Sequence, residues 1–339
     1  MSTVNLSSLK QHDRWLRFIW TIVLPIGLAA LLLVQALQGI DWERVWVILQ
    51  QANVKQLFLG FTVLTFSYFL RALRWQVLLG MRKTIPAITV FWGINVGYLG
   101  NAFLPARAGE LLRTLLISRY ASISKSFVLA TVVSERVLDA GFLVVLAMIV
   151  MSRLQGTPKW LEVATRTFGG IAVIGIVILL AVPYLQSQIE RILLQKIPQR
   201  LSLLGHIVNF MNQFAQGSSA LQQPMRMLSF LLLTVLLWST DVLYALIIGG
   251  ALGLTLSVLQ VVLLLAALGL SSAVPSTPGY VGIYQFVAVS VLTPFAFSRN
   301  EALVFILVFQ AVTYIVILAW GGVGLLRLNR FSLSDDKLE

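Results

Sequence analysis

Hydrophobic runs separated by short polar stretches make up most of the chain, and their lengths predict its secondary structure. An α-helix needs roughly 20 consecutive apolar residues to cross a bilayer, and several of these runs reach that length. The clear transmembrane helices are predicted at Leu16–Leu37, Leu57–Leu79, Phe127–Met151, Phe168–Tyr184, Met227–Gly250 and Ala302–Leu326. The pattern therefore predicts an all-α integral membrane protein with about six full spans.

Two further hydrophobic segments, Ile85–Leu104 and Val258–Pro294, are predicted to be interrupted and to enter the bilayer and return on the same side, and their breaks share a Pro-x-x-x-Gly core. Proline ends a helix and glycine permits a tight turn, so each break predicts a re-entrant helical hairpin. The residues assigned to the hairpin tips are Pro105, Gly109, Pro275, Pro278, Gly279 and Gly282. Matched helix breaks in two halves of a membrane protein indicate a transport site, whereas ordinary turn-forming loops are the alternative.

Positive charge orients the chain, because Lys and Arg accumulate on cytoplasmic loops. With a formal charge of +12, the loop basic residues predict cytoplasmic termini and a first hairpin that enters from the cytoplasm. The second hairpin then enters from the other face, so 57–151 and 225–330 are expected to be two inverted-topology repeats. The remainder of the single domain 1–339 is predicted as an anchor span and external segment (1–56), a connecting span with a cytoplasmic amphipathic helix (152–224) and a cytoplasmic tail (331–339). Because topology explains the positive charge, no nucleic-acid partner is expected. We expect a multi-pass protein of the plasma (inner) membrane.

Composition excludes several kinds of chemistry. The chain is 58% hydrophobic, has a mean hydropathy of +0.88, and contains no cysteine and only two histidines. Thiol catalysis, disulfides and a histidine metal centre are therefore not expected. The sequence has no phosphate-binding glycine-rich loop of the nucleotide-hydrolysing kind, so direct ATP drive is not expected. The acidic residues are few and scattered, without the spacing of a calcium-binding loop, and neither a metal nor a cofactor is predicted.

Charged residues inside predicted spans are the second functional signal, since each is unfavourable at membrane depth. Glu135, Arg136 and Asp139 lie two to three turns into one helix, and Arg71 and Arg74 lie one turn apart on another. Asp241 in a later span is a further candidate. A buried structural ion cluster is the alternative for the first group, and snorkelling of the two arginines to the interface is the alternative for the second.

The stretch from Ala108 to Tyr120 has apolar residues on one side and basic residues on another. This amphipathic pattern predicts a cytoplasmic surface helix beside the first hairpin, in the headgroup layer of the bilayer.

In order along the chain, the motifs are Arg71-x-x-Arg74-Trp75, Gly97-x-x-x-Asn101-x-x-x-Pro105-x-Arg107-x-Gly109-Glu110-x-x-Arg113, Glu135-Arg136-x-x-Asp139 and Pro275-x-x-Pro278-Gly279-x-x-Gly282. Together they resemble the flippase-like transmembrane domain of lysylphosphatidylglycerol synthases, over about residues 60 to 325. Gln285 is a departure, because many relatives carry a glutamate there. In those synthases an aminoacyl-transferase domain follows the membrane domain, so this chain is expected to be a stand-alone member without it.

The resemblance implies translocation of a lipid or polyprenyl-linked anionic substrate between leaflets, with ion coupling as an option. The residues predicted to bind substrate or line its cavity are Arg71, Arg74, Asn101, Arg107, Glu110, Arg113, Glu135, Arg136, Asp139, Ser272, Thr277 and Gln285. Guanidinium groups suit phosphate because they donate forked, charge-assisted hydrogen bonds. The expected partners are anionic phospholipid or polyprenyl phosphate, together with lipid-synthesising enzymes.

Two other functions stay open at this point. An integral-membrane transferase acting on lipid-linked substrate would use Glu110 or Glu135 as its base. A non-catalytic scaffold of a lipid-modifying complex would need none of these charges for chemistry.

Overall fold

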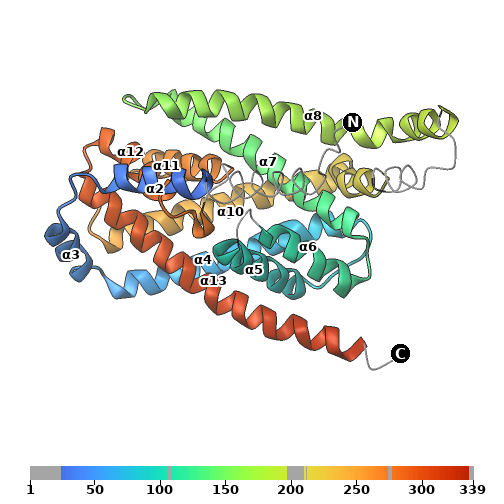
Figure 1. The fold of residues 1–339 in the computed structure, drawn as a ribbon, viewed down its shortest axis with the longest axis horizontal. Helices are drawn as coiled ribbons and strands as arrows, with labels where there is room; N and C mark the ends of the chain where they lie inside the picture. Colours follow the sequence, from blue (N-terminus) through green and yellow to red (C-terminus); the bar gives the residue numbers. More distant parts are fainter. Residues whose placement is uncertain (1–23, 105–107, 197–209, 211, 274–276, 336–339) are drawn as a thin grey trace, which may run out of the picture.

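Helices make up almost all of the described chain in the computed structural model, which covers residues 24–104, 108–196, 210, 212–273 and 277–335 (Figure 1). No strand occurs in those ranges. The α-helices are α2 (Leu24–Leu37), α3 (Trp42–Gln50), α4 (Val54–Leu79), α5 (Ala87–Phe103), α6 (Ala108–Ala121), α7 (Lys125–Met151), α8 (Lys159–Lys196), α10 (Pro224–Ala251), α11 (Val258–Ser271), α12 (Ile283–Leu292) and α13 (Arg299–Asp335). The short 3-10 turns are η3 (Ser219–Gln222), η4 (Pro278–Tyr280) and η5 (Thr293–Phe295). The predicted all-α fold is confirmed.

Polar residues at the helix starts satisfy the backbone N–H groups that have no partner inside a helix. Asn53 accepts hydrogen bonds from the first amides of α4, and Ser124 accepts one from the amide of Phe127 in α7. At the start of α11, Ser257 and Gln260 form a reciprocal capping box. These caps fix where long apolar helices begin, which hydrophobicity alone does not.

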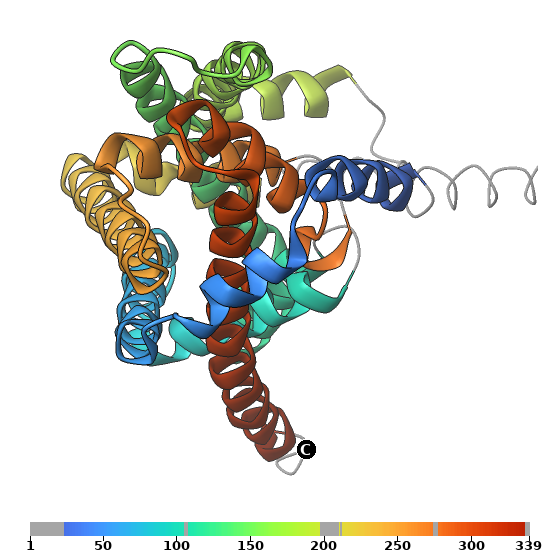
Figure 2. The same ribbon diagram turned by 90° about the vertical axis from the view of Figure 1, so that its left-hand side faces the viewer.

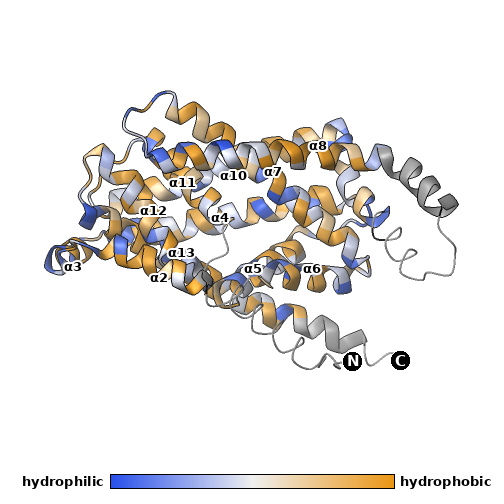
Figure 3. Ribbon diagram, turned by 45° about the horizontal axis from the view of Figure 1, so that its top comes forward, coloured by the Kyte–Doolittle hydropathy of each residue, from blue (hydrophilic) through white to orange (hydrophobic). Residues whose placement is uncertain are grey.

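Four helices are long and apolar enough to cross a bilayer: Val54–Leu79, Lys159–Tyr184, Pro224–Ala251 and Arg299–Leu328. They correspond to four of the six predicted spans. α7 has 27 residues, but Glu135, Arg136 and Asp139 reduce its apolar character. The first predicted span is described only from Leu24, and α2 and α3 together form a pair bent by 84°. Most of the helical ribbon is coloured as hydrophobic, and α3 contains a group of hydrophilic residues (Figure 3).

Two pairs of short helices, α5 with α6 and α11 with α12, pack against each other as hairpins. These helices have 17, 14, 14 and 10 residues, each fewer than the roughly 20 needed to cross a bilayer. The second pair lies inside the predicted segment Val258–Pro294. The first predicted segment, Ile85–Leu104, contains only the single helix α5, so the prediction missed the second arm of that hairpin. We refer to α5 and α6 as hairpin 1, and to α11, η4 and α12 as hairpin 2.

The prediction for α6 as a surface helix was wrong, because α6 is the second arm of hairpin 1. Gly109, Arg113 and Ile117 on this helix are buried, and the backbone of Gly109 lies against Gly97 and Gly100 of α5. Small residues let two helices approach closely, and this close approach outweighs the amphipathic pattern of the segment.

The long helices that precede the two hairpins, α4 and α10, run in opposite directions. At one end, the amide of Asn53 before α4 donates to the carbonyl of Ala251 in α10 (2.8 Å). Near the other end, the guanidinium of Arg226 in α10 donates to the carbonyl of Val77 in α4 (3.0 Å). α4 and α10 are therefore antiparallel neighbours.

Each hairpin also packs on the long helix that follows the other hairpin. α5 lies along α13, where Gly321 approaches Leu99, and α11 lies along α7, where Gly269 approaches Leu143. In Figure 1, α5 and α6 occupy the right-hand part of the bundle, whereas α11 and α12 occupy the left-hand part. Figure 2, viewed along the bundle, shows α13 passing through the middle. The two hairpins therefore extend from opposite ends of the bundle toward its centre.

Gly109→Ala tests the close approach within hairpin 1. A Cβ atom at this position would lie 1.9 Å from the carbonyl oxygen of Gly97, and backbone atoms cannot move aside cheaply. We expect destabilisation by about 3 kcal/mol, the upper end of ordinary overpacking, in reversible unfolding in mixed micelles. Gly170→Ala in α8 is the matched control, because nothing lies within 4 Å of its added Cβ. Equal stability of the two variants would mean that α5 and α6 do not pack this closely.

Candidate functional site

Arg74 of α4 is the centre of a buried ion cluster. Its side chain is fully buried, and its Nη1 and Nη2 atoms contact the carboxylate of Asp139 at 2.5 and 2.8 Å. Nη2 also donates to Oε1 of Glu135 at 2.7 Å, and Nη1 donates to the hydroxyl of Thr234 in α10 at 3.3 Å. One arginine thus joins α4 to α7 and α10 through charge-assisted hydrogen bonds.

Hairpin 1 joins this cluster through Glu110 and Arg113 of α6. The guanidinium of Arg113, 1% exposed, pairs with Oε2 of Glu135 at 3.0 Å and with Oε2 of Glu110 at 2.6 Å. The other oxygen of Glu110 pairs with Arg136 of α7. Glu110 is therefore shared by two arginines, one buried and one, Arg136, with 37% of its side chain exposed.

A further ion pair joins α4 to α10. Arg71 donates to one carboxylate oxygen of Asp241, and the hydroxyl of Ser67 donates to the other at 2.5 Å. The guanidinium of Arg71 also lies 5.7 Å from the ring centroid of Trp238, within the range of a cation–π contact.

These ion pairs combine four arginines with four carboxylates: Arg71, Arg74, Arg113, Arg136, Glu110, Glu135, Asp139 and Asp241. The formal charges cancel, which lowers the free-energy penalty of placing ions in an apolar bundle. Further support comes from aromatic faces, since Arg74 lies 5.0 Å from the ring of Phe230 and Arg113 lies 4.6 Å from that of Trp75. The cluster is neutral as a whole, so removing one of its members leaves it with an unbalanced charge.

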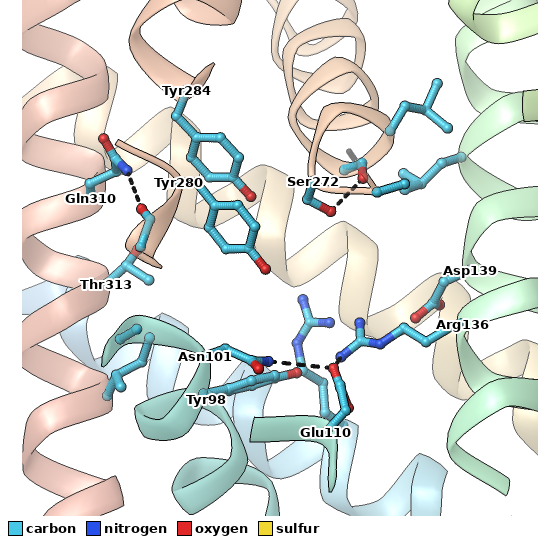
Figure 4. A pocket seen from close by; sticks show the side chains of 18 of the residues that line it. Tyr98, Asn101, Glu110, Arg136, Asp139, Ser272, Tyr280, Tyr284, Gln310 and Thr313 are labelled. Carbon is cyan, nitrogen blue, oxygen red and sulfur yellow. Dashed lines mark hydrogen bonds and ion pairs between the residues drawn. The ribbon is translucent and has the colours of Figure 1, made fainter. Parts of the chain in front are cut away.

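A cavity of about 330 Å³ lies beside the ion cluster, between the two hairpins. Asn101 and Ala102 near the end of α5 line it from hairpin 1, and Ser272, Gly279 and Tyr280 line it from hairpin 2. Figure 4 shows Arg136, Glu110, Asn101 and Asp139 along one side and Tyr280 and Tyr284 opposite them. Described residues next to both predicted breaks therefore line one cavity.

The structure brings about half of the predicted binding residues to the cavity wall. These residues are Arg71, Asn101, Glu110, Arg136, Asp139 and Ser272. Arg74, Arg113 and Glu135 lie beneath them in the ion cluster and do not line the cavity. Pro105, Arg107 and Pro275 lie outside the described residues.

Gln285 and Thr277 form hydrogen bonds within hairpin 2, and neither side chain lines the cavity. The buried side chain of Gln285 accepts from the amide of Gly282 at 2.7 Å and donates to Gln310 of α13 at 2.6 Å. Thr277 donates to the carbonyl of Val281 at 2.7 Å, across the turn that contains Pro278 and Gly279. Two amides thus attach hairpin 2 to α13, whereas ion pairs attach hairpin 1 to α7.

The cavity residues that sequence reasoning missed are mainly aromatic. They are Tyr68, Tyr98, Phe168, Trp238, Tyr280, Tyr284, Phe309 and Tyr314, with Gln310 and Thr313. Tyrosine and glutamine inside apolar spans were the available signal, because a polar group at membrane depth needs a partner or water. Aromatic residues also fill ordinary helix interfaces, so this signal does not separate cavity from core.

Within the ranges that the structure describes, no group of three or more acidic or histidine side chains is arranged to hold a metal ion. The chemistry that the site offers is hydrogen bonding, ion pairing and aromatic contact.

Comparison with known proteins agrees with this architecture. The family model described as the lysylphosphatidylglycerol synthase TM region matches residues 22–321. The chain is also similar to the UPF0104 membrane protein PH1989 of Pyrococcus horikoshii, at 24% identity over 337 residues, covering 93% of this chain and 98% of that protein. No solved structure matches the chain. The chain is a multi-pass membrane protein and belongs to the family of the lysylphosphatidylglycerol synthase transmembrane region.

Proposed function

We propose that the chain moves a lipid with an anionic headgroup, of the phospholipid or polyprenyl phosphate class, between the two leaflets of the membrane. The observation that carries this proposal is the cavity lined by residues of both hairpins, with Arg71 and Arg136 on its wall. Polar cavities beside broken helices are where membrane transporters bind their substrates. The headgroup occupies the cavity while the acyl or prenyl chains stay in lipid.

The arrangement of the two halves supports alternating access. Each half has the order long helix, hairpin, long helix, with α4 to α7 in one and α10 to α13 in the other. Their first helices are antiparallel, and each hairpin contacts the last helix of the opposite half. Two such inverted repeats can exchange conformations, which opens a central site first to one face and then to the other. In our proposal both termini are cytoplasmic and the membrane is the plasma (inner) membrane, because the basic loops favour that orientation.

Arg136 is the arginine best placed to receive a phosphate. It lines the cavity, has an exposed fraction of 37%, and pairs only with Glu110 among the described carboxylates. Since Glu110 also pairs with Arg113, it keeps a cationic partner when a phosphate replaces it at Arg136. Such an exchange lets an anion bind without stranding a buried carboxylate, and it loosens one connection between hairpin 1 and α7.

Arg74 and Arg113 have a supporting role in this proposal. Both side chains are almost fully enclosed and already pair with two carboxylates each. Glu110 and Glu135, the bases considered for a transferase, are held by those same arginines. Ion-paired carboxylates are poor proton acceptors, which favours translocation over the transferase alternative.

Arg136→Ala tests the proposal in liposomes that contain the purified chain and a trace of fluorescent phosphatidylglycerol or polyprenyl phosphate. We expect leaflet exchange to fall by at least about tenfold, because a charge-assisted hydrogen bond to the phosphate is lost. Stability is expected to change by less than about 1 kcal/mol, since Arg136 is partly exposed and Glu110 keeps Arg113. Arg166→Ala, at an exposed position of α8, is the control and should exchange lipid like the wild type. Unchanged exchange in Arg136→Ala would remove Arg136 from the mechanism.

A further inference from the structure

The two sides of the cavity differ in chemistry, and the difference bears on which headgroup fits. One side presents an arginine, two carboxylates, an amide and a tyrosine from hairpin 1 and α7, namely Arg136, Glu110, Asp139, Asn101 and Tyr98. The opposite side presents tyrosine rings from hairpin 2 (Figure 4). A headgroup bound between the two sides would contact hydrogen-bonding groups on one side and a flat aromatic surface on the other.

The aromatic side is a stacked pair. The ring centroids of Tyr280 and Tyr284 are 4.8 Å apart, and the ring planes differ by 9°. A stacked pair of this kind offers a flat face to a bound group, whereas aromatic cages for ammonium groups surround the charge with several rings. A flat face favours a flat, ring-shaped guest.

The backbone holds Tyr280 in an unfavourable conformation. Its φ is +61°, in the left-handed region that a bulky side chain rarely adopts, and Gly279 before it has φ +71°. Hydrogen bonds surround the turn: Tyr280 N–H donates to the carbonyl of Thr277 at 3.1 Å, and Gln310 and Tyr314 both donate to the carbonyl of Gly279. Strained residues that persist because their surroundings fix them cluster at binding sites.

The charges on the cavity wall further limit the chemical class of headgroup that fits. The cavity wall has two arginines, Arg71 and Arg136, and two carboxylates, Glu110 and Asp139, within a cluster of four of each. The cluster has no surplus negative charge for an ammonium group. A bare phosphate only accepts hydrogen bonds, so it leaves Asp139 and Glu110 without a donor from the guest. Hydroxyl groups both donate and accept, and they match such a mixed wall without adding charge.

We propose that the transported lipid carries a hydroxylated ring, such as a hexose or an inositol, attached to its phosphate. The ring stacks on the Tyr280–Tyr284 pair, and its hydroxyl groups bond to Glu110, Asp139 and Asn101 while the phosphate contacts Arg136. A cavity of about 330 Å³ is at the small end of ligand pockets, which suits one such headgroup with its chains outside. This inference rests on the proposed function, because it assigns the substrate class of the same cavity.

The test compares three lipids labelled on the acyl chain, each present in trace amounts in the same proteoliposomes. Phosphatidylinositol has a hydroxylated ring on its phosphate, phosphatidylglycerol has an open-chain polyol, and phosphatidylethanolamine has an ammonium group. We expect phosphatidylinositol to exchange about tenfold faster than the other two, as aromatic contact with the ring adds to the shared phosphate contact.

Variants of Tyr280 separate ring recognition from folding. Tyr280→Leu should lower phosphatidylinositol exchange much more than phosphatidylglycerol exchange, so that the preference is lost, whereas Tyr280→Phe should keep the preference. Tyr280→Gly removes the ring and also relieves the left-handed backbone, so it should lose the preference while folding at least as stably as the wild type. Tyr184→Leu, at an exposed tyrosine of α8, is the control and should keep the preference.

Each result has a defined meaning. Exchange of all three lipids at one rate, fastest exchange of phosphatidylethanolamine, or an equal fall of all three in Tyr280→Leu would overturn the ring inference and leave lipid translocation standing. Exchange of none of them above the rate of protein-free liposomes, with folded protein, would contradict both proposals for these lipids.

Discussion

Arg74→Ala is expected to destabilise the folded chain by about 3–5 kcal/mol, the largest loss of stability that we predict for one substitution. The reason is that Asp139 and Glu135 lose a fully buried guanidinium that contacts both of them. An unpaired carboxylate in an apolar bundle is far more costly than a broken surface ion pair. Equilibrium unfolding in mixtures of SDS and mild detergent measures the difference directly.

A double substitution tests this explanation against simple loss of packing. Asp139→Asn removes one of the uncompensated charges, so Arg74→Ala with Asp139→Asn should be more stable than Arg74→Ala alone. Arg166→Ala at an exposed position should change stability by less than about 1 kcal/mol. If the double variant is no more stable than Arg74→Ala, the main contribution of Arg74 is its side-chain volume rather than its charge.

A disulfide between α5 and α13 is expected to stop leaflet exchange completely and reversibly. The chain contains no cysteine, so an introduced pair is the only one present. A Cβ atom on Gly321 of α13 would lie 2.8 Å from the Cβ of Leu99 in α5. Disulfides prefer about 3.5–4.5 Å between these atoms, so a small outward movement of the helices accommodates the bond. Oxidised Leu99→Cys with Gly321→Cys fixes hairpin 1 to the opposite half, and the reductant should restore exchange.

The control for this experiment joins α7 and α8, outside the hairpins. A Cβ atom on Gly141 would lie 4.0 Å from the Cβ of Ala172, within the disulfide range. Oxidised Gly141→Cys with Ala172→Cys should exchange lipid at the wild-type rate. Full exchange by the α5–α13 variant, with its disulfide shown to be formed, would mean that hairpin 1 does not move along α13 during transport.

The sequence predicts the membrane fold and the hairpins because their signals are local. Twenty-residue apolar runs define the spans, and the breaks around Gly109 and Gly279 define the hairpin tips. The prediction from sequence was wrong for α6, because the charged positions of this segment favour the membrane surface when the segment is considered alone. The contacts of Gly109 with Gly97 and Gly100 show that α6 packs within hairpin 1.

The site was predicted less well, because it depends on pairings between distant residues. Arg74 and Glu135 are 61 positions apart, and Arg71 and Asp241 are 170 apart, so their pairing cannot be predicted from spacing. Position on the helix alone favoured snorkelling for Arg74, whereas the structure encloses it completely. The tyrosines of the cavity were missed since an aromatic residue in an apolar helix has the same local pattern at a cavity and in a core.

Leaflet exchange by the wild-type chain is the most direct test of the central proposal. The measurement compares liposomes that contain the purified, folded chain with protein-free liposomes, using labelled phosphatidylglycerol, phosphatidylinositol and a polyprenyl phosphate. Translocation predicts exchange well above the protein-free rate for at least one of these lipids. Exchange at the protein-free rate for every one of them would contradict translocation and favour a transferase or a scaffold.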